Sequence, residues 1–224
     1  MIAHVSPQWI ENLFIDPATN QKYVKQGITQ PQADFPIVKL WDPNTLKAKL
    51  FKTSIHNRSQ TEDKGMGGFF WPDALGQALG QLGQQTNIPG VDNTTGITGR
   101  REDAFEQPLS ILTGYNAVAR NFSTYTNTDG TDYELWTHFR YCNSTPVMFN
   151  TLNVTKVTGE HQFGDHHVYP VIDAQWASDG QRWVTVRNVW GKTEWFKFED
   201  VKANGLSTLY LRDWNKLQWL DSWG

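Results

Sequence analysis

Apolar and polar residues follow two different periods along the chain, helical in several early segments and alternating in most late ones. Residues 36–53 carry two alternating runs around the turn sequence DPNT, which predicts a β-hairpin. Residues 69–85 place apolar side chains at helical spacing behind Pro72, which predicts a helix in spite of its internal glycines. Residues 86–103 are predicted to be a loop from their composition.

Three shorter segments also have a helical pattern. Residues 6–14 offer Ser6 as the N-cap and Pro7 at the first helical position, and residues 106–119 and 131–141 are further candidates. From residue 146 onward, short alternating runs divided by Gly, Asp and Asn predict strands: PVMFNTLNV, HVYPVIDAQW, RWVTVRNVW, EWFKFEDV and LSTLYLRDW. Helices that gather early and strands that gather late indicate an α+β fold with two segregated lobes.

Charge and length exclude several classes of function. The formal net charge is -3, and the Lys and Arg residues are scattered, so we expect no nucleic-acid partner and no anionic membrane surface. No apolar run approaches the length of a membrane span, and the first residues lack the pattern of a signal peptide. We therefore expect a soluble chain and leave its compartment open.

A histidine and an asparagine lie at matching ends of two adjacent predicted strands. In HHVYPVIDAQWASDGQRWVTVRNVWGKTEW, residues 166–195, His167 opens one alternating run and Asn188 closes the next. If the two runs pair antiparallel through the SDG turn, both residues lie at the same end of the hairpin. The asparagine oxygen would then accept the imidazole N–H and orient the ring. Trp190, two residues on, would shield that bond from water.

These segments resemble the second half of calpain-type cysteine peptidases, a branch of the papain-like fold. HVYPV is similar to the family pattern His-Ala-Tyr-x-Val, and RNVWGKTEW to Arg-Asn-Pro-Trp-Gly-x-x-Glu-Trp. Upstream, SPQWIENLFIDPATNQKYV, FPIVKLWDPNTLKAKLFKTS and GGFFWPDALGQALGQL resemble family segments in the same order. The resemblance implies a papain-like fold with an incomplete, helical first lobe over residues 1–113 and an antiparallel, β-barrel-like second lobe over residues 114–224.

The resemblance also implies the role of each site residue. His167 would be the general base and acid of peptide-bond hydrolysis, Asn188 would orient its ring, and Trp190 would shield the pair. The substrate would be an extended peptide or protein.

Three positions near these residues depart from the family pattern. His166 stands where the family usually has glycine, Pro170 replaces a small polar residue, and Val189 replaces proline. We expect these departures to affect substrate fit and local backbone geometry, but not the roles of the histidine and the asparagine.

The nucleophile that such a peptidase requires is missing from the sequence. The family segment Gln-x-x-x-Gly-Asp-Cys-Trp does not occur, and Cys142, the single cysteine, follows the first lobe and is interpreted as an ordinary buried or half-buried thiol. In the family, the residues after the nucleophile helix would correspond to this chain's first few, so MIAHV is interpreted as the last turn of that helix. The isolated chain is therefore predicted to be inactive.

Three explanations for the missing nucleophile stay open. The natural protein carries the cysteine upstream, a separate or cleaved segment supplies it, or the chain is a pseudoprotease that keeps the fold for binding. Loss of a central helix should expose apolar surface in the first lobe, so we expect a covering segment, a separate chain or a homo-oligomer.

The sequence predicts no cofactor and no metal ligand. The family resemblance allows calcium, but the chain continues from Trp195 almost directly into KFEDVKANG, without a long acidic insertion, and Glu199 and Asp200 alone make a weak site. The competing function is a non-catalytic module that binds a peptide or a glycan, because the chain contains 11 tryptophans and tryptophan often lines such clefts.

Overall fold

The computed structural model separates the chain into two compact units, which are described one at a time. One unit comprises Gln8–Asn116 with Trp223–Gly224, and the other comprises Ala117–Ser222 with Met1–Pro7. The structure describes the following residues: 2, 7–21, 36–53, 71–86, 91–92, 96–97, 107–125, 132–151, 154, 163–188 and 192–213.

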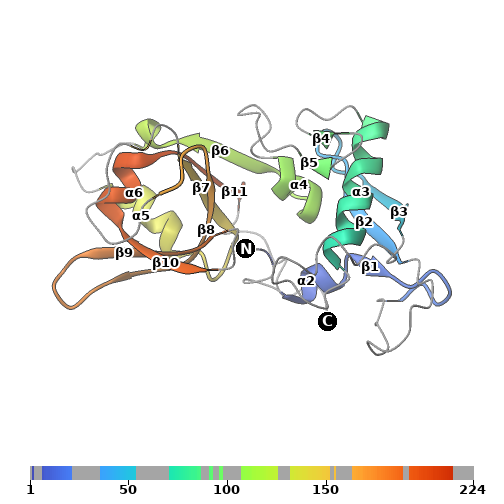
Figure 1. The fold of residues 1–224 in the computed structure, drawn as a ribbon, viewed down its shortest axis with the longest axis horizontal. Helices are drawn as coiled ribbons and strands as arrows, with labels where there is room; N and C mark the ends of the chain where they lie inside the picture. Colours follow the sequence, from blue (N-terminus) through green and yellow to red (C-terminus); the bar gives the residue numbers. More distant parts are fainter. Residues whose placement is uncertain are drawn as a thin grey trace. The chain divides into compact units, whose positions relative to one another are not determined.

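The unit of residues 8–116 is a small antiparallel sheet with helices. Its elements are α2 (Pro7–Glu11), β1 (Phe14–Ile15), β2 (Ile37–Trp41), β3 (Ala48–Lys52), α3 (Trp71–Thr86), β4 (Val91–Asp92), β5 (Gly96–Ile97) and α4 (Gln107–Thr113). The strands order as β1-β2-β3, and β4 pairs with β5. Helix α3 packs on β2 and β3 (Figure 1). The predictions of the 36–53 hairpin and of the helix after residue 69 are therefore confirmed.

Helix α3 forms despite its glycines because its apolar residues bury one continuous face. Ala74, Ala78 and Leu82 are fully buried, at spacings of four residues, and the sheet contributes Val38 and Leu40 to the same core. Burial of this face offsets the cost of about 1 kcal/mol that each helical glycine brings relative to alanine.

Helix α4 ends earlier than the sequence predicts. It stops at Thr113, where Gly114 takes a φ of 72° and its N–H donates to the Ser110 carbonyl at 2.8 Å. The prediction of helix over 106–119 is wrong beyond this point, because Ala117–Asn121 form a strand instead. The indole of Trp9 fixes this end of the helix by donating to the Leu112 carbonyl at 2.8 Å.

The second unit is built on one six-stranded antiparallel sheet. Its elements are β6 (Ala117–Asn121), η4 (Phe122–Thr124), α5 (Tyr133–Arg140), β7 (Val147–Thr151), β8 (Val168–Trp176), β9 (Arg182–Arg187), β10 (Thr193–Lys197), α6 (Phe198–Asn204) and β11 (Gly205–Leu211). The strand order is β10-β9-β8-β7-β11-β6. Within the described residues, this sheet is open, with β10 and β6 at its edges, so it is not a closed barrel. The α+β class is confirmed at this coarser level.

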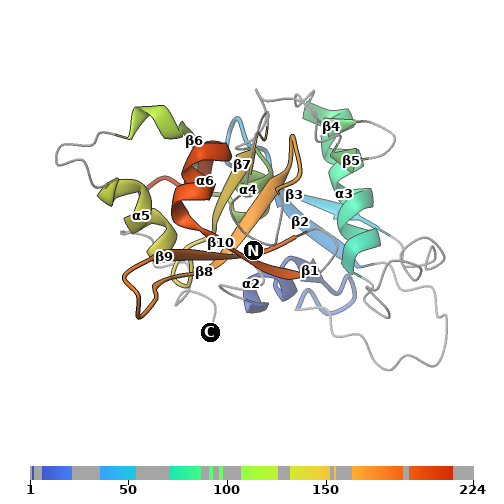
Figure 2. The ribbon, with the colours of Figure 1, turned by 60° about the vertical axis from the view of Figure 1, so that its left-hand side comes forward.

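Helices α5 and α6 lie on the same side of the sheet (Figure 2), where α5 contacts β8 and α6 contacts β9 and β10. Their aromatic side chains form one core with the strands, and Phe139, Phe149 and Phe198 are almost completely buried within it. Helix α6 corrects the strand prediction for EWFKFEDV, which holds only to Lys197. Glu199 and Asp200 in its first turn favour the helix because the N-terminus of a helix is electropositive.

Strand β8 contains a bulge that changes which residues face the core. Val171 pairs with Val186, but Asp173 pairs with Thr185, so one extra residue lies between them. Tyr169 and Val171 are buried before the bulge, and Ala174 is buried after it. The inward-facing positions are therefore odd-numbered in the first part of the strand and even-numbered in the last.

Among the helices that the structure describes, none has the length and apolar character needed to span a membrane.

Candidate functional site

His167 directly precedes β8, and the neighbouring strand β7 fixes its backbone. Its N–H donates to Thr151 Oγ1 at 3.2 Å, and its carbonyl accepts the Thr151 N–H at 2.9 Å. The Thr151 hydroxyl also donates to the Gly164 carbonyl at 2.6 Å. Thr151, the last residue of β7, thus bonds both to Gly164 and to His167, at the two ends of the turn that leads into β8.

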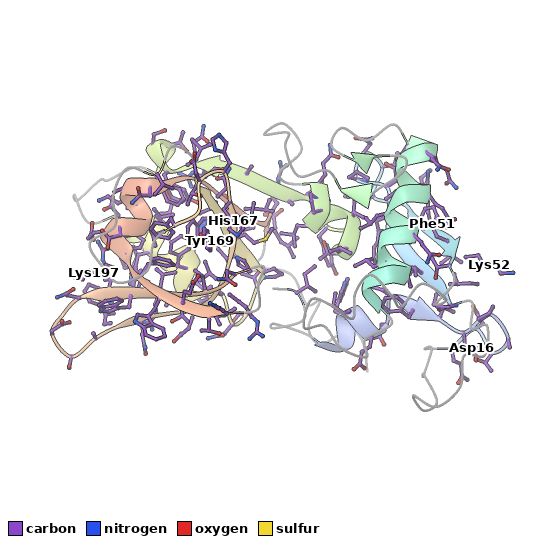
Figure 3. The ribbon with its side chains drawn as sticks, viewed as in Figure 1. Asp16, Phe51, Lys52, His167, Tyr169 and Lys197 are labelled. Atoms are coloured by element: carbon purple, nitrogen blue, oxygen red, sulfur yellow. The ribbon has the colours of Figure 1, made fainter. Side chains whose placement is uncertain are left out.

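The imidazole of His167 is half-buried beside an aromatic side chain. Its ring centroid lies 4.8 Å from that of Tyr169, at an interplanar angle of 63° (Figure 3). Tyr169 is itself fixed, since its ring stacks on Phe149 and its hydroxyl accepts the Gly164 N–H at 2.7 Å. Burial raises the pKa of Tyr169, so its hydroxyl stays neutral at ordinary pH. These contacts give the imidazole a rigid wall on one side.

Asn188 follows β9 and closes the connection to β10. Its backbone N–H donates to the Lys192 carbonyl at 2.9 Å, and its Oδ1 accepts the Lys192 N–H at 3.0 Å. Its Nδ2 donates to Glu194 Oε2 at 3.0 Å. A backbone N–H needs an acceptor and a carboxylate needs a donor, so these partners together define which side-chain atom is oxygen and which is nitrogen.

The β8–β9 pairing ends at Val171 and Val186. If the same register is extended by two residues, Tyr169 lies opposite Asn188. His167 lies two residues before Tyr169, on the same face of the extended chain. In this extended register, the two side chains belong to one end and one face of the β8–β9 pair. The hydrogen bond between them that the resemblance implies stays a prediction.

Glu194 is a part of this arrangement that the sequence analysis missed. It pairs with Val186 in the sheet, so its half-buried carboxylate is on the same face as the buried Phe196. A charged residue at an inward-facing position of a strand is the signal that could have identified it. Trp190, the third predicted site residue, lies outside the described residues.

His166, which departs from the family's usual glycine, adopts a backbone conformation that favours glycine. Its φ is 52°, and its exposed ring lies with Nδ1 3.1 Å from Asp165 Oδ2. A non-glycine residue with positive φ costs on the order of 1 kcal/mol, so His166 lowers the stability of the fold slightly.

Cys142 lies in the core of the second unit and is fully buried. Burial raises the pKa of its thiol to about 12, and the nearby negative charge of Asp173 adds to the effect. A nucleophilic thiol requires the opposite environment, with positive charge nearby and access to substrate. The structure therefore gives Cys142 the environment of an ordinary buried thiol.

The described residues contain no group of three or more His, Cys, Asp or Glu side chains that could hold a metal ion. Compared with protein-family models and with curated proteins, the chain matches none. The resemblance to calpain-type peptidases thus depends on the quoted sequence segments.

Proposed function

We propose that the chain is the part of a calpain-like cysteine endopeptidase domain that follows the nucleophile. The observation that supports the proposal is the β8–β9 pairing up to Val171 and Val186, because extending that register would bring His167 and Asn188 to one end and one face of the two strands. An imidazole and an amide in this arrangement make up the base and orienting group of a papain-like site.

In the proposed reaction, His167 acts twice on a peptide substrate. It first takes the proton from a cysteine thiol that a segment outside this sequence supplies, and the thiolate attacks the peptide carbonyl. The resulting imidazolium then gives that proton to the leaving amine, and water hydrolyses the acyl-enzyme. Asn188 holds the imidazole in one orientation during both transfers.

Two local features support this reading. His166 has a positive φ where the family usually has glycine, so the chain approaches His167 along a path that suits the family pattern. Glu194 accepts a hydrogen bond from Asn188 Nδ2, which leaves the amide oxygen as the group that could accept the imidazole N–H. The oxygen already accepts the Lys192 N–H, and a carbonyl oxygen has a second lone pair for another donor.

A second candidate function is a non-catalytic binding module with the same fold. The burial of Cys142 favours it, because the sequence then contains no thiol that could act as the nucleophile. The two candidates differ in whether a thiol from another segment meets His167.

Nuclear Overhauser contacts between the His167 ring and the Asn188 side-chain amide would test the geometry directly. We expect such contacts in the 224-residue chain, together with one dominant imidazole tautomer in long-range ¹H–¹⁵N spectra. Two side chains with no mutual contact and an evenly mixed tautomer population would contradict the proposed pair.

Complementation tests the chemistry. The chain is mixed with a synthetic peptide that contains the family's Gly-Asp-Cys-Trp segment, and hydrolysis of an unstructured protein is followed. We expect His167→Ala to lower any resulting activity by about a thousandfold, the usual contribution of a general base. His166→Ala is the matched control: this exposed ring pairs only with Asp165 among the contacts described, so the variant should change substrate fit at most and lose far less activity than His167→Ala. Equal losses in both variants would count against the assignment.

A further inference from the structure

A pocket of about 430 Å³ lies at the opposite end of β8 from His167. Its wall is formed by the end of β8, the β8–β9 turn and the junction of β10 with α6, through Trp176, Gly180, Gln181, Arg182, Lys197 and Glu199. The nine residues of β8 rise about 3.3 Å each, so the two ends lie roughly 25–30 Å apart. Figure 3 shows Lys197 and His167 well separated within the unit.

Trp176 provides a fixed aromatic surface in this pocket. The residue is 55 % exposed, and its ring makes an edge-to-face contact with that of Trp136, with ring centroids 5.8 Å apart and an interplanar angle of 76°. An indole that is held by such a contact and remains half exposed can bind a ligand without a large loss of side-chain entropy.

Arg182 is a polar group of fixed orientation whose guanidinium lies over the ring of this indole. It pairs with Trp176 across the hairpin, and its guanidinium carbon lies 4.2 Å from the ring centroid of Phe198 and 5.8 Å from that of Trp176. The guanidinium forms an ion pair with Glu199. Stacking and ion pairing together hold a planar set of N–H donors at the edge of the pocket.

The combination of groups selects the class of ligand. An apolar ligand would remove the charged groups of Arg182, Lys197 and Glu199 from water and offer them no hydrogen bonds in exchange, which is costly. A phosphate-bearing ligand would approach the Glu199 carboxylate. A pyranose ring suits both the aromatic and the charged lining of the pocket. Its C–H face can pack on the indole, while its hydroxyls bond to N–H donors and to a carboxylate.

We propose that this pocket binds a saccharide, with one neutral pyranose ring stacked on Trp176 and its hydroxyls bonded to Arg182, Glu199 and Gln181. A volume of this size is within the range of small-molecule sites, roughly 300–1,000 Å³. The site does not depend on the proposed peptidase function, because none of its residues contacts His167 or Asn188 in the interactions described.

Titration of the full chain with maltotriose, cellotriose and triacetylchitotriose tests the site. The readout is the indole N–H resonance of Trp176 in ¹H–¹⁵N spectra, assigned by loss of the peak in Trp176→Phe. We expect at least one trisaccharide to shift this resonance in a saturable way. Trp176→Ala should weaken binding at least about tenfold, and Gln181→Ala, at an exposed position, should weaken it less.

Trp195→Ala is the matched control, because Trp195 is 54 % exposed but does not line the pocket. This variant should bind the trisaccharide as the unaltered chain does. The assignment is wrong if no trisaccharide shifts the Trp176 resonance, or if the two tryptophan variants lose binding equally.

Discussion

His138 is a histidine whose surroundings oppose its charge. It lies on α5 between two tyrosines, with its ring 4.4 Å from that of Tyr210 and its Nδ1 3.2 Å from the Tyr125 hydroxyl. Desolvation by burial lowers its pKa from 6.5 to about 4, although the Glu134 carboxylate acts in the opposite direction. Tyr125 also bonds to Thr208, so the histidine belongs to a polar group that joins α5 to β11.

This shift predicts that stability falls in mild acid. The folded chain resists protonation of His138, so the unfolded chain binds more protons below about pH 6.5. The contribution of neutral His138 to the free energy of unfolding is therefore fully present above that pH and is lost as the pH falls. We expect a loss of roughly 2–3 kcal/mol as the pH falls from about 6.5 to about 4. Denaturant titrations across this range measure it. His138→Phe retains a ring and should flatten the pH dependence; an unchanged slope would exclude His138 as its source.

Cys142 gives a second prediction for a single residue. Because the thiol is fully buried and its pKa is raised to about 12, a thiol reagent at mildly alkaline pH should label it only after the chain unfolds. Cys142→Ser should cost about 1–3 kcal/mol by burying a hydroxyl in an apolar site, and Cys142→Ala serves as the comparison without a polar group. Rapid, complete labelling of the native chain would show that the thiol is accessible.

The site residues differ in how far sequence could identify them. His167 and Asn188 are candidates from the sequence because a turn signal places them at matching ends of two runs, and the β8–β9 hairpin around that turn is confirmed. The sequence analysis did not identify Glu194 and Thr151, because each contacts a candidate residue only through a hydrogen bond from another segment of the sheet. Thr151 lies 16 residues before His167, and no local pattern connects the two.

Secondary-structure elements were predictable where local signals agree with the tertiary contacts. The β2–β3 hairpin has both alternation and a turn sequence, and α3 has a continuous buried face. Strand β6 could not be predicted locally, because it forms by pairing with β11, where Ala117 faces Leu211. Helix α6 had a usable signal in the buried residues Phe198 and Val201, three positions apart, but the alternation before it concealed the change of period.

Two glycines with similar backbone angles test the end of α4. Gly114 has a φ of 72°, and a Cβ there would lie 2.5 Å from Nε1 of Trp41; Gly180 has a φ of 77° and open space around the same position. Gly114→Ala should therefore cost about 3 kcal/mol or more, from backbone strain and overpacking together, while Gly180→Ala should cost only about 1 kcal/mol from strain. Urea denaturation measures the free energy of unfolding of both variants. Equal losses in the two would show that contact with Trp41 does not contribute to the effect at Gly114.

At the scale of the whole molecule, the chain forms two compact units, and the large aromatic cluster belongs to one of them. All members of this cluster lie between Phe122 and Tyr210. Phe139→Ala should create a cavity costing about 3–5 kcal/mol.

Hydrogen exchange can locate that loss. Amide protection should fall in β7, β8, β9 and β11, which contribute side chains to the same cluster or pack against it, and should stay unchanged in β2 and β3 of the other unit. A matched loss of protection in β2 and β3 would show that the two units unfold as one cooperative body.

The extra residue in β8 has a consequence for how this protein can tolerate insertions and deletions. An antiparallel strand alternates its side chains, so parity decides which of them a ligand can meet on a given side. Removing Ile172 would leave the histidine end correctly facing and would turn the tryptophan end over, or the reverse. A single residue thus sets whether the two ends of β8 present their side chains on the same face of the sheet, and deleting it would turn one end over without changing any residue at either end.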